Sequence, residues 1–331
     1  MNELAGKSVL VTGAGGFIGS HLTRRLVAEG ARVSAFVHTE EDRRSLADVL
    51  EQVSLYSVDI GQADAVRDAV AHVRPRVIFH LAAVGTGEPA ITLQTALRVN
   101  IEGTRNLIET ASRKGVQRFV HTGTAYEYGE VARYDLANGE KLDPLAIYAA
   151  SKLASHALAQ EYARTRGLPV VLLRLFAVYG PGQSIKSLIP SAVRAALEER
   201  DFPMTAGEQL RDFVFVRDVV EGYARAATSK GIEGRTIDLG TGNALAVRDA
   251  VMRTFRLTGS HARPLVGALP YRPGEMMDQV ADPRPARELI GWQATTALED
   301  GLRQTIEWYR QATGDSNTSP VVHYQPFSIG H

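Results

Sequence analysis

Short apolar runs alternate with helix-like segments through the first half of the chain. Each run is rich in Val, Ile, Leu and Phe and is bounded by polar residues, as expected for a strand that is buried on both faces. The strands predicted in this way cover residues 8–11, 32–37, 53–58, 77–81, 119–122 and 170–175. Strands that alternate with helices predict an α/β fold, a doubly wound parallel sheet with helices on both faces.

Beyond residue 179 the alternation becomes irregular. We expect helices over residues 187–200 and 218–228, a strand over 212–216, and a strand over 236–239 that returns to the main sheet. Further elements of a smaller lobe are expected over residues 265–273, 283–289 and 298–310. The second half of the chain is therefore predicted to add a separate lobe to the main sheet.

The change of pattern also predicts how the chain is divided. The first domain should span residues 1–178, and residues 236–260 should return to it. A smaller, partly discontinuous C-terminal lobe is expected from residues 179–235 and 261–312. Residues 313–331 form a tail that is polar at its start and apolar near its end, so it can dock on this subunit or on a neighbouring one.

The composition excludes several classes of function. Lys and Arg together number 37, as do Asp and Glu, so no net charge directs the protein to nucleic acid or to an anionic membrane. The 331 residues include no Cys, which excludes disulfides, thiolate catalysis and cysteine zinc sites. The nine His form no His-x-x-x-His pair, so no metal site is predicted. Without a signal peptide or an apolar run of membrane-spanning length, a cytoplasmic location is expected.

A glycine-rich turn follows the first predicted strand. Gly13, Gly16 and Gly19 lie between this strand and a helix-like segment over residues 20–29. Gly13 permits a tight turn, Gly16 lets the backbone approach a pyrophosphate, and Gly19 lets the helix pack closely on the strand. This order is typical of a dinucleotide site, although the spacing Gly-x-x-Gly-x-x-Gly differs by one residue from the common fingerprint.

A second pattern consists of Tyr148 and Lys152, which stand four residues apart and so share one face of a predicted helix. The ammonium favours the phenolate and lowers the pKa of the tyrosine, which suits a proton donor. The lysine can also hydrogen-bond a cofactor ribose. Taken alone, the pair fits a solvated helix surface better than a catalytic site. Combined with the glycine turn, it indicates proton chemistry that depends on a cofactor.

Together these motifs resemble the extended short-chain dehydrogenase/reductase family, in its NAD(P)-dependent nucleotide-sugar epimerase, dehydratase and reductase branch. The resemblance covers nearly the whole chain. Besides the two patterns above, it rests on residues 80–83, 122–124, 128–129, 174–176, 178–181, 211–216, 272–275 and 289–292. It implies a Rossmann-like fold with a substrate-binding C-terminal lobe, and an oxidoreductase or epimerase activity.

The resemblance also implies a cofactor site. Its expected residues are Gly13, Gly16, Phe17, Ile18, Gly19, His38, Arg43, Asp59, Ile60, Leu81, Ala82, Ala83, Thr122, Tyr148 and Lys152. Val37 stands where NAD-specific members carry an Asp that binds the ribose hydroxyls, and Arg43 and Arg44 follow shortly after it. A missing carboxylate removes the repulsion of a 2′-phosphate, which nearby cations can bind. NADP(H) is therefore favoured, with NAD(H) as the alternative.

Thr124 completes the implied catalytic set with the Tyr–Lys pair. It occupies the position where the family places a Ser or Thr that hydrogen-bonds the reacting oxygen. The family's 4,6-dehydratases follow this position with an acid pair, whereas this chain has Ala125 and Tyr126, and Glu127 comes one place too late unless the turn rearranges. Elimination therefore lacks its usual proton carriers, and chemistry that needs only hydride transfer and one proton remains.

The substrate site implied by the resemblance consists of Thr124, Tyr126, Arg211, Arg272 and Glu275. Arg211 matches a contact to the sugar nucleotide, Arg272 a clamp on the diphosphate, and Glu275 an acid that binds the nucleoside ribose. Guanidinium groups suit phosphate oxygens, although arginines also occur on protein surfaces without any ligand. The family often has Asn where this chain has Ala177, so diphosphate binding must rely on other groups.

We therefore predict NADP(H)-dependent reduction of a 4-keto, 6-deoxy nucleotide sugar, with Tyr148 as the proton donor. A nucleotide-sugar 4-epimerase with tightly bound NAD(P) is the first alternative, and a catalytically silent dinucleotide-binding sensor or scaffold is the second. Family members commonly dimerise through two helices, here residues 96–114 and 147–166, so a homodimer is expected.

Overall fold

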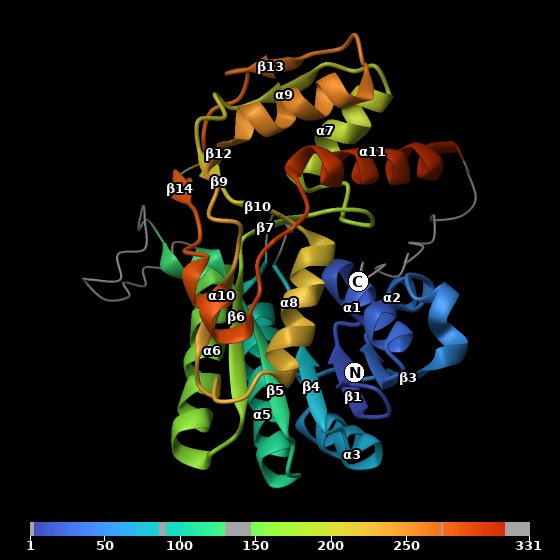
Figure 1. Ribbon diagram of the computed structural model, residues 1–331, viewed down its shortest axis with the longest axis vertical. Coiled ribbons are helices and arrows are strands. Elements are labelled where there is room, and N and C mark those ends of the chain that lie inside the picture. The colour runs from blue at the N-terminus through green and yellow to red at the C-terminus, as the bar shows by residue number, and fades with distance from the viewer. Residues whose placement is uncertain (1–2, 86–90, 130–146, 273, 315–331) are drawn as a thin grey trace.

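A parallel sheet of seven strands forms the centre of the molecule, in the order β11-β6-β5-β4-β1-β2-β3 (Figure 1). The structure is a computed structural model that describes residues 3–85, 91–129, 147–272 and 274–314, so most of the predicted tail lies outside the described residues. The strands are β1 (Ser8–Thr12), β2 (Arg32–Val37), β3 (Val53–Ser57), β4 (Val77–His80), β5 (Arg118–Thr124), β6 (Val170–Leu175) and β11 (Thr236–Leu239). The predicted doubly wound sheet is confirmed, and each predicted strand of the first half agrees with an observed one to within two residues at either end.

Helices cover both faces of this sheet because its side chains alternate between two cores. Val9 and Val11 of β1 pack on one face, and Leu10 packs on the other. The covering helices are α1 (Phe17–Ala28) and α8 (Val216–Thr228) on the first face, and α3 (Ala63–Val73), α5 (Thr104–Arg113) and α6 (Ile147–Arg166) on the second. All three β1 side chains are fully buried, which explains the continuous apolar run in this strand. None of the described helices is long and apolar enough to span a membrane.

A second group of helices lies beyond the carboxyl ends of the strands, at the top of Figure 1. It contains α7 (Leu188–Leu197), α9 (Val247–Thr258) and α11 (Leu298–Gly314), which pack on one another. Short strands pair beside them: β7 (Ala177–Tyr179) with β10 (Phe213–Phe215), β8 (Phe202–Met204) with β13 (Pro264–Val266), and β9 (Leu210–Arg211) with β12 (Leu245–Ala246) and β14 (Asp278–Gln279). The predicted return of residues 236–239 to the main sheet is confirmed, since β11 pairs with β6.

The remaining elements are short connections. They are α2 (Glu40–Arg44), the 3-10 helix η1 (Ala47–Gln52), α4 (Leu93–Ala96), the π-helix η2 (Leu97–Gly103), the 3-10 helix η3 (Ala125–Tyr128) and α10 (Arg284–Ile290). Ile290 of α10 and the neighbouring Trp292 belong to the core beneath α8, so this part of the chain packs on the main sheet. The proposed division into a first domain and a smaller lobe stays a prediction.

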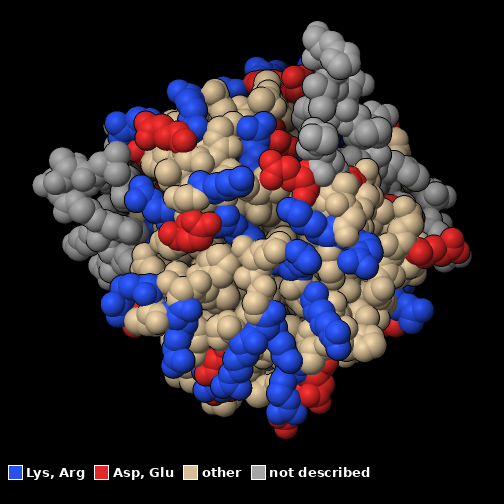
Figure 2. Space-filling view, turned by 60° about the horizontal axis from the view of Figure 1, so that its bottom comes forward, with Lys and Arg blue, Asp and Glu red and all other residues tan. Residues whose placement is uncertain are grey.

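The balanced total charge is unevenly distributed over the surface. Figure 2 brings the lower face of Figure 1 toward the viewer, and more of the charged surface seen there belongs to Lys and Arg than to Asp and Glu. The helices α5 and α6 end on this side, with Arg113, Arg164 and Arg166 in their last turns. Cations interact favourably with the negative end of a helix dipole, so these arginines stabilise the ends of their own helices.

Candidate active site

The glycine turn joins β1 to α1 and approaches other backbone at two points. Gly13 has a φ of 65°, and a Cβ there would lie 2.8 Å from the amide nitrogen of Ala82. A Cβ on Gly19 would lie 2.0 Å from the carbonyl oxygen of Gly13. Close backbone packing therefore requires glycine at both positions. Gly16 differs, because a Cβ there would meet only that same oxygen, at 3.3 Å.

The first turn of α1 fits a phosphate ligand. Gly16 is the N-cap of this helix, and no side chain caps it. Phe17 and Ile18 follow as the first helical residues, whose amides have no partner within the helix. Such amides, together with the helix dipole, bind anions. The residues present thus suit the pyrophosphate of a dinucleotide at the position that the sequence predicted.

The end of β2 carries the residues on which the cofactor prediction depends. Val37 is buried, whereas His38 is exposed. Arg43 and Arg44 are exposed at the end of α2, and their side chains form no hydrogen bond or ion pair with the residues that the structure describes. Both guanidinium groups are thus available to a phosphate.

A carboxylate that the sequence analysis did not identify lies beside these residues. Asp42 accepts hydrogen bonds from the backbone amides of His38, at 3.1 Å, and Thr39, at 2.9 Å, and so caps α2. A Cβ on Gly15 would lie 2.3 Å from the Cβ of Asp42, so α2 packs directly on the glycine turn. Since Asp42 stands five residues after the end of β2, only the fold shows that its charge lies at this edge of the predicted cofactor site.

The other predicted cofactor residues lie at the carboxyl ends of β3 and β4. Asp59 accepts hydrogen bonds from the amide of Gly61 at 2.9 Å and from Arg98 at 2.5 Å, and the adjacent Ile60 is buried. At the end of β4, the Ala82 amide donates to the hydroxyl of Thr12 at 3.2 Å. Leu81, Ala82 and Ala83 are half-buried, and they run beside the glycine turn.

The structure brings the predicted proton-transfer residues together. Tyr148 and Lys152 lie one turn apart near the start of α6, which packs against η3, the turn that follows Thr124. The rings of Tyr148 and Tyr126 stand edge to face with their centres 6.4 Å apart. The Thr124 hydroxyl oxygen accepts a hydrogen bond from the Tyr126 amide at 3.3 Å, which leaves the hydroxyl proton for an acceptor in the site. Burial lowers the pKa of Lys152 to about 8, although the charge of Glu127 opposes this.

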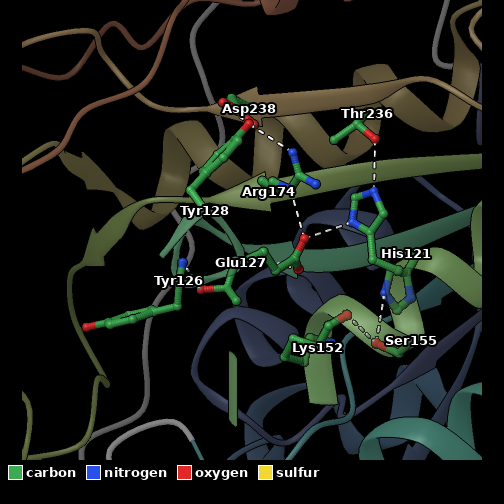
Figure 3. A network of polar contacts seen from close by, with 11 residues as sticks. His121, Tyr126, Glu127, Tyr128, Lys152, Ser155, Arg174, Thr236 and Asp238 are labelled. Atoms are coloured by element: carbon green, nitrogen blue, oxygen red, sulfur yellow. Dashed lines mark hydrogen bonds and ion pairs between the residues drawn. The ribbon is translucent and has the colours of Figure 1, made fainter. Parts of the chain in front are cut away.

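Glu127 follows Thr124 by three residues and is fully buried, and Figure 3 shows it between Arg174 and Lys152. Its carboxylate accepts hydrogen bonds from the Thr124 amide at 2.9 Å and from the Arg174 guanidinium at 2.8 Å, and it lies 3.0 Å from Nδ1 of His156. Burial alone would raise the pKa of Glu127, but His156 and Arg174 outweigh it and lower this pKa to about 2. Glu127 is therefore ionised, and its carboxylate is held in the core by its neighbours.

The contacts of Arg174 extend this network to the edge of the sheet. Its guanidinium donates to the Tyr128 hydroxyl at 2.9 Å and stacks 4.5 Å above the centre of the same ring. The Tyr128 hydroxyl in turn donates to Asp238 at 2.9 Å, and His156 contacts the Thr236 hydroxyl at 3.0 Å. Elements η3, α6, β6 and β11 are thus joined by a network of polar side chains that adjoins Lys152 (Figure 3).

The predicted substrate residues lie at two places. Arg211 and Glu275 form an ion pair with a distance of 2.7 Å, and the arginine is buried. Arg272 is exposed, and its side chain has no hydrogen-bond or ion-pair partner among the described residues. Tyr126 is 44% exposed and borders the phenol of Tyr148. Two of the three charged groups are therefore already paired with each other, and the third is available to a ligand.

The buried histidines near the site are held by hydroxyl groups. The ring nitrogens of His80 lie 2.8 Å from the Thr12 hydroxyl and 2.9 Å from the Thr104 hydroxyl. Burial, with a smaller effect from Lys152, lowers the pKa of His80 to about 3, and it lowers that of His121 well below the ordinary value. Both rings are therefore neutral at neutral pH. No three His, Asp or Glu side chains within the described part of the chain are grouped so as to hold a metal ion.

Two further polar residues near the site were not predicted. Asn100 of η2 donates to the carbonyl of Val84 at 3.0 Å and to the hydroxyl of Ser151 at 2.9 Å, so it ties the loop after β4 to α6. Tyr223 of α8 shares a hydrogen bond of 2.6 Å with the predicted site residue Thr122. These contacts join residues 51 and 101 positions apart, and no local sequence pattern signals them.

Comparisons with known proteins agree with this geometry. Residues 9–240 match the model of the NAD dependent epimerase/dehydratase family. The UDP-glucose 4-epimerase of Mycolicibacterium smegmatis is 31% identical over 312 residues, which cover 91% of this chain and 98% of that protein. The dTDP-glucose 4,6-dehydratase 1 of Escherichia coli is 30% identical over 342 residues, which cover 92% of this chain and 93% of the dehydratase.

The fold is similar to that of a relative whose structure was solved with a nucleotide sugar and NAD bound. The UDP-glucuronic acid 4-epimerase of Bacillus cereus, in complex with UDP-glucuronic acid and NAD, superposes with a TM-score of 0.83 at 27% sequence identity, over 92% of this chain and 99% of that one. Both the sequence motifs and the fold are therefore shared with nucleotide-sugar enzymes. This chain is an enzyme of the NAD dependent epimerase/dehydratase family, within the nucleotide-sugar branch of the extended short-chain dehydrogenases/reductases.

Proposed function

We propose that this enzyme transfers hydride at carbon 4 of a nucleotide-diphosphate sugar without eliminating water, and that its net reaction is the NADP(H)-dependent reduction of a 4-keto, 6-deoxy sugar. One observation carries this proposal. The start of α6, which carries Tyr148 and Lys152, packs on the turn that begins at Thr124, whereas Ala125 and Tyr126 occupy the positions where elimination would need acids. A site with a single proton donor suits the interconversion of a ketone and an alcohol.

The residues divide the work of such a reduction between them. The nicotinamide cofactor, when bound, supplies the hydride, and the chain supplies orientation and the proton. The Thr124 hydroxyl donates a hydrogen bond to the carbonyl oxygen, and Tyr148 transfers its phenolic proton to that oxygen as the carbon accepts the hydride. Lys152 stabilises the phenolate that remains, because its charge lies one helical turn away.

Binding of substrate and cofactor is assigned to the two regions predicted from the sequence. The part formed by residues 1–178 would hold NADP(H), with Arg43 and Arg44 on the 2′-phosphate. Arg272 would hold the diphosphate of the substrate, because it is exposed and unpaired among the described residues. The epimerase of Bacillus cereus binds UDP-glucuronic acid, which supports a nucleotide-diphosphate sugar as the substrate class.

A nucleotide-sugar 4-epimerase is the second candidate. The relative in Mycolicibacterium smegmatis is an epimerase, and the structural neighbour in Bacillus cereus holds NAD. The capping carboxylate of Asp42 also lies against the glycine turn, and a negative charge there favours ribose hydroxyls over a 2′-phosphate. This candidate needs the same three catalytic residues and a cofactor that is retained through the turnover.

Consumption of the cofactor distinguishes the two reactions. The purified enzyme is mixed with NADPH and a 4-keto-6-deoxy nucleotide sugar, and the absorbance of the reduced nicotinamide is followed. A reductase consumes one NADPH for each ketone. An epimerase instead isomerises a 4-hydroxy nucleotide sugar with no net change in cofactor, and that result would replace the first candidate by the second.

The proton donor is tested by Tyr148→Phe, which should slow turnover by about a hundredfold to ten-thousandfold while cofactor still binds. Tyr162→Phe is the matched control, because this tyrosine lies on the same helix and its hydroxyl bonds Glu109 at 3.2 Å, away from the site. Turnover above half of the parent value in Tyr148→Phe would remove this residue from the mechanism.

A further inference from the structure

Glu127 carries a buried negative charge next to the candidate site, and the proposed reaction assigns no role to it. Glu127 is fully buried, and its two carboxylate oxygens contact three different elements. An ionised carboxylate in a protein interior is costly unless cations and hydrogen bonds compensate it. The groups that Glu127 contacts therefore indicate what its charge does.

One neighbour is the backbone of Thr124. Oε1 of Glu127 accepts a hydrogen bond from the Thr124 amide at 2.9 Å, while the Thr124 hydroxyl accepts one from the Tyr126 amide at 3.3 Å. This reciprocal arrangement is a capping box, and it fixes the junction of β5 and η3. The hydroxyl that would hold the substrate oxygen is thus oriented through Glu127.

The second neighbour is Lys152, which is only 3% exposed. Burial lowers the pKa of Lys152 to about 8, and the charge of Glu127 is what opposes that change. The titratable side chains that interact electrostatically with this lysine are His80 of β4, His121 of β5 and Glu127 of η3. Tyr148 lies one turn away on α6, and His156 and Arg174 contact Glu127 on its other side. Of these side chains, Glu127 carries the negative charge that favours a protonated Lys152. The pKa values of His80 and His121 are too low for these rings to be charged at neutral pH.

Arg174 keeps the carboxylate in place. Its Nε donates to Glu127 Oε2 at 2.8 Å, and the rest of its guanidinium is fixed by the Tyr128 ring and hydroxyl (Figure 3). Because Arg174 and Glu127 are 2% and 0% exposed, neither can turn toward solvent without opening the core. The charge next to the site is therefore rigid, which suits a role in positioning.

We propose that Glu127 is a positioning residue for proton transfer: it orients Thr124 through its amide and supplies the negative charge that keeps Lys152 protonated at neutral pH. This inference rests on the proposed function, because it assigns Lys152 and Thr124 to the reaction. Because Glu127 is fully buried, it would act through Thr124 and Lys152 and not by direct contact with a ligand. Without its charge, Lys152 would become neutral at a lower pH, and Tyr148 would lose the cation that makes it a good acid.

The ionisation of Lys152 can be measured without any substrate. The chain has only six lysines, so ¹³C labelling at Cε gives a simple NMR spectrum, in which Lys152→Arg identifies one signal. In Glu127→Gln the amide oxygen can still accept the Thr124 hydrogen bond, but the charge is gone. The midpoint of the Lys152 titration should then fall by on the order of one pH unit, as expected for the loss of one nearby opposite charge.

Asp218→Asn is the matched control for this experiment. Asp218 is also a buried acid, 4% exposed, and its carboxylate accepts hydrogen bonds from Thr295 and from the amide of Thr296. Its loss should lower the melting temperature without moving the Lys152 signal. A Glu127→Gln variant that behaves in the same way, less stable with an unchanged Lys152 titration, would overturn the proposal and leave Glu127 a purely structural role.

A second variant covers the case in which Glu127→Gln alone does not fold, since it removes the carboxylate that compensates the buried charge of Arg174. Glu127→Gln combined with Arg174→Gln replaces the ion pair by a neutral hydrogen-bonding pair. The Lys152 midpoint is again expected to fall, by less than in the single variant because a positive charge is lost as well. A midpoint that does not fall would equally refute the proposal.

The pH dependence of turnover supplies a readout that a structural role would not move. The alkaline limb of the kcat profile should shift to lower pH in Glu127→Gln, and Glu127→Asp should restore part of the shift. A kcat limb that stays at the parent position while the Lys152 midpoint falls would refute the catalytic part of the inference. Failure of the proposed function would be seen separately, as full turnover in Tyr148→Phe, and would leave the Lys152 titration unaffected.

Discussion

The substitution Gly19→Ala should destabilise the packing of α1 on β1. The new Cβ would lie 2.0 Å from the carbonyl oxygen of Gly13 and 2.9 Å from the carbonyl carbon, and both are backbone atoms. Gly13 has no room to retreat, because its own Cβ position lies 2.8 Å from the Ala82 amide. Overpacking costs about 1–3 kcal/mol where side chains adjust and more where the backbone must shift, so we expect a loss of about 3 kcal/mol or more.

Alanine at Gly16 is the matched control in the same turn. Gly16 has a φ of −69° and a ψ of 172°, which alanine adopts without strain, and its Cβ would meet one oxygen at 3.3 Å. The fold should therefore change by no more than about 1 kcal/mol. The new methyl group would instead stand where a pyrophosphate approaches the helix amides. Loss of one charged hydrogen bond costs about 1.5–3 kcal/mol, which weakens cofactor binding about 10- to 100-fold.

Two measurements separate these effects: thermal unfolding without cofactor, and calorimetric titration with NAD and NADPH. Gly19→Ala should melt several degrees below the parent, whereas Gly16→Ala should melt with the parent and bind cofactor at least about tenfold more weakly. If Gly19→Ala melts like the parent, the argument from backbone contact is wrong. If Gly16→Ala binds cofactor like the parent, the pyrophosphate does not lie at the start of α1.

Three further predictions concern cofactor choice, assembly and acid stability. Arg43→Ala combined with Arg44→Ala should lower the preference for NADPH over NADH about tenfold in titrations, and a parent that binds NADH more tightly would contradict the NADP(H) assignment. Leu158→Arg on α6 should give monomers in light scattering, and a monomeric parent would end the dimer prediction. The folded-state pKa of Glu127, about 2, lies below its ordinary 4.5, so its ionised form stabilises the fold above pH 4.5 and this contribution is lost as the pH falls toward 2. The melting temperature of Glu127→Gln should therefore fall less steeply than that of the parent over this range.

The main sheet could be predicted from the sequence because its strands are buried on both faces. In a strand such as Val170–Leu175 every side chain is buried and all but Arg174 are apolar, so the run is visible without any knowledge of the partners. The paired strands β7 and β10 have only three residues each, too few for a period to be recognised. The sequence predicts a strand over residues 212–216 but does not indicate which strand it pairs with. Only the fold shows that β10 pairs with β7 outside the main sheet.

In the candidate site, residues that share one helix could be predicted, and contacts between distant elements could not. Tyr148 and Lys152 were predicted together because both lie on one helix, where spacing alone determines which side chains share a face. Asp42 and Asn100 were missed because their contacts come from other elements: the glycine turn for Asp42, and the β4 loop and α6 for Asn100. A pattern of residue types carries no information about such tertiary contacts.

Glu127 shows how a single position along a short turn changes the chemistry that is available. The turn η3 is a 3-10 helix with three residues per turn, so neighbouring side chains point about 120° apart. Tyr126 is 44% exposed and its ring faces that of Tyr148, whereas Glu127 is fully buried among Arg174 and His156. An acid at position 126 would thus face the substrate side, while the acid at 127 faces the core. The sequence left open a rearrangement that would turn Glu127 into the site, but its hydrogen bonds to Arg174 and to the backbone amide before the turn oppose any such rotation.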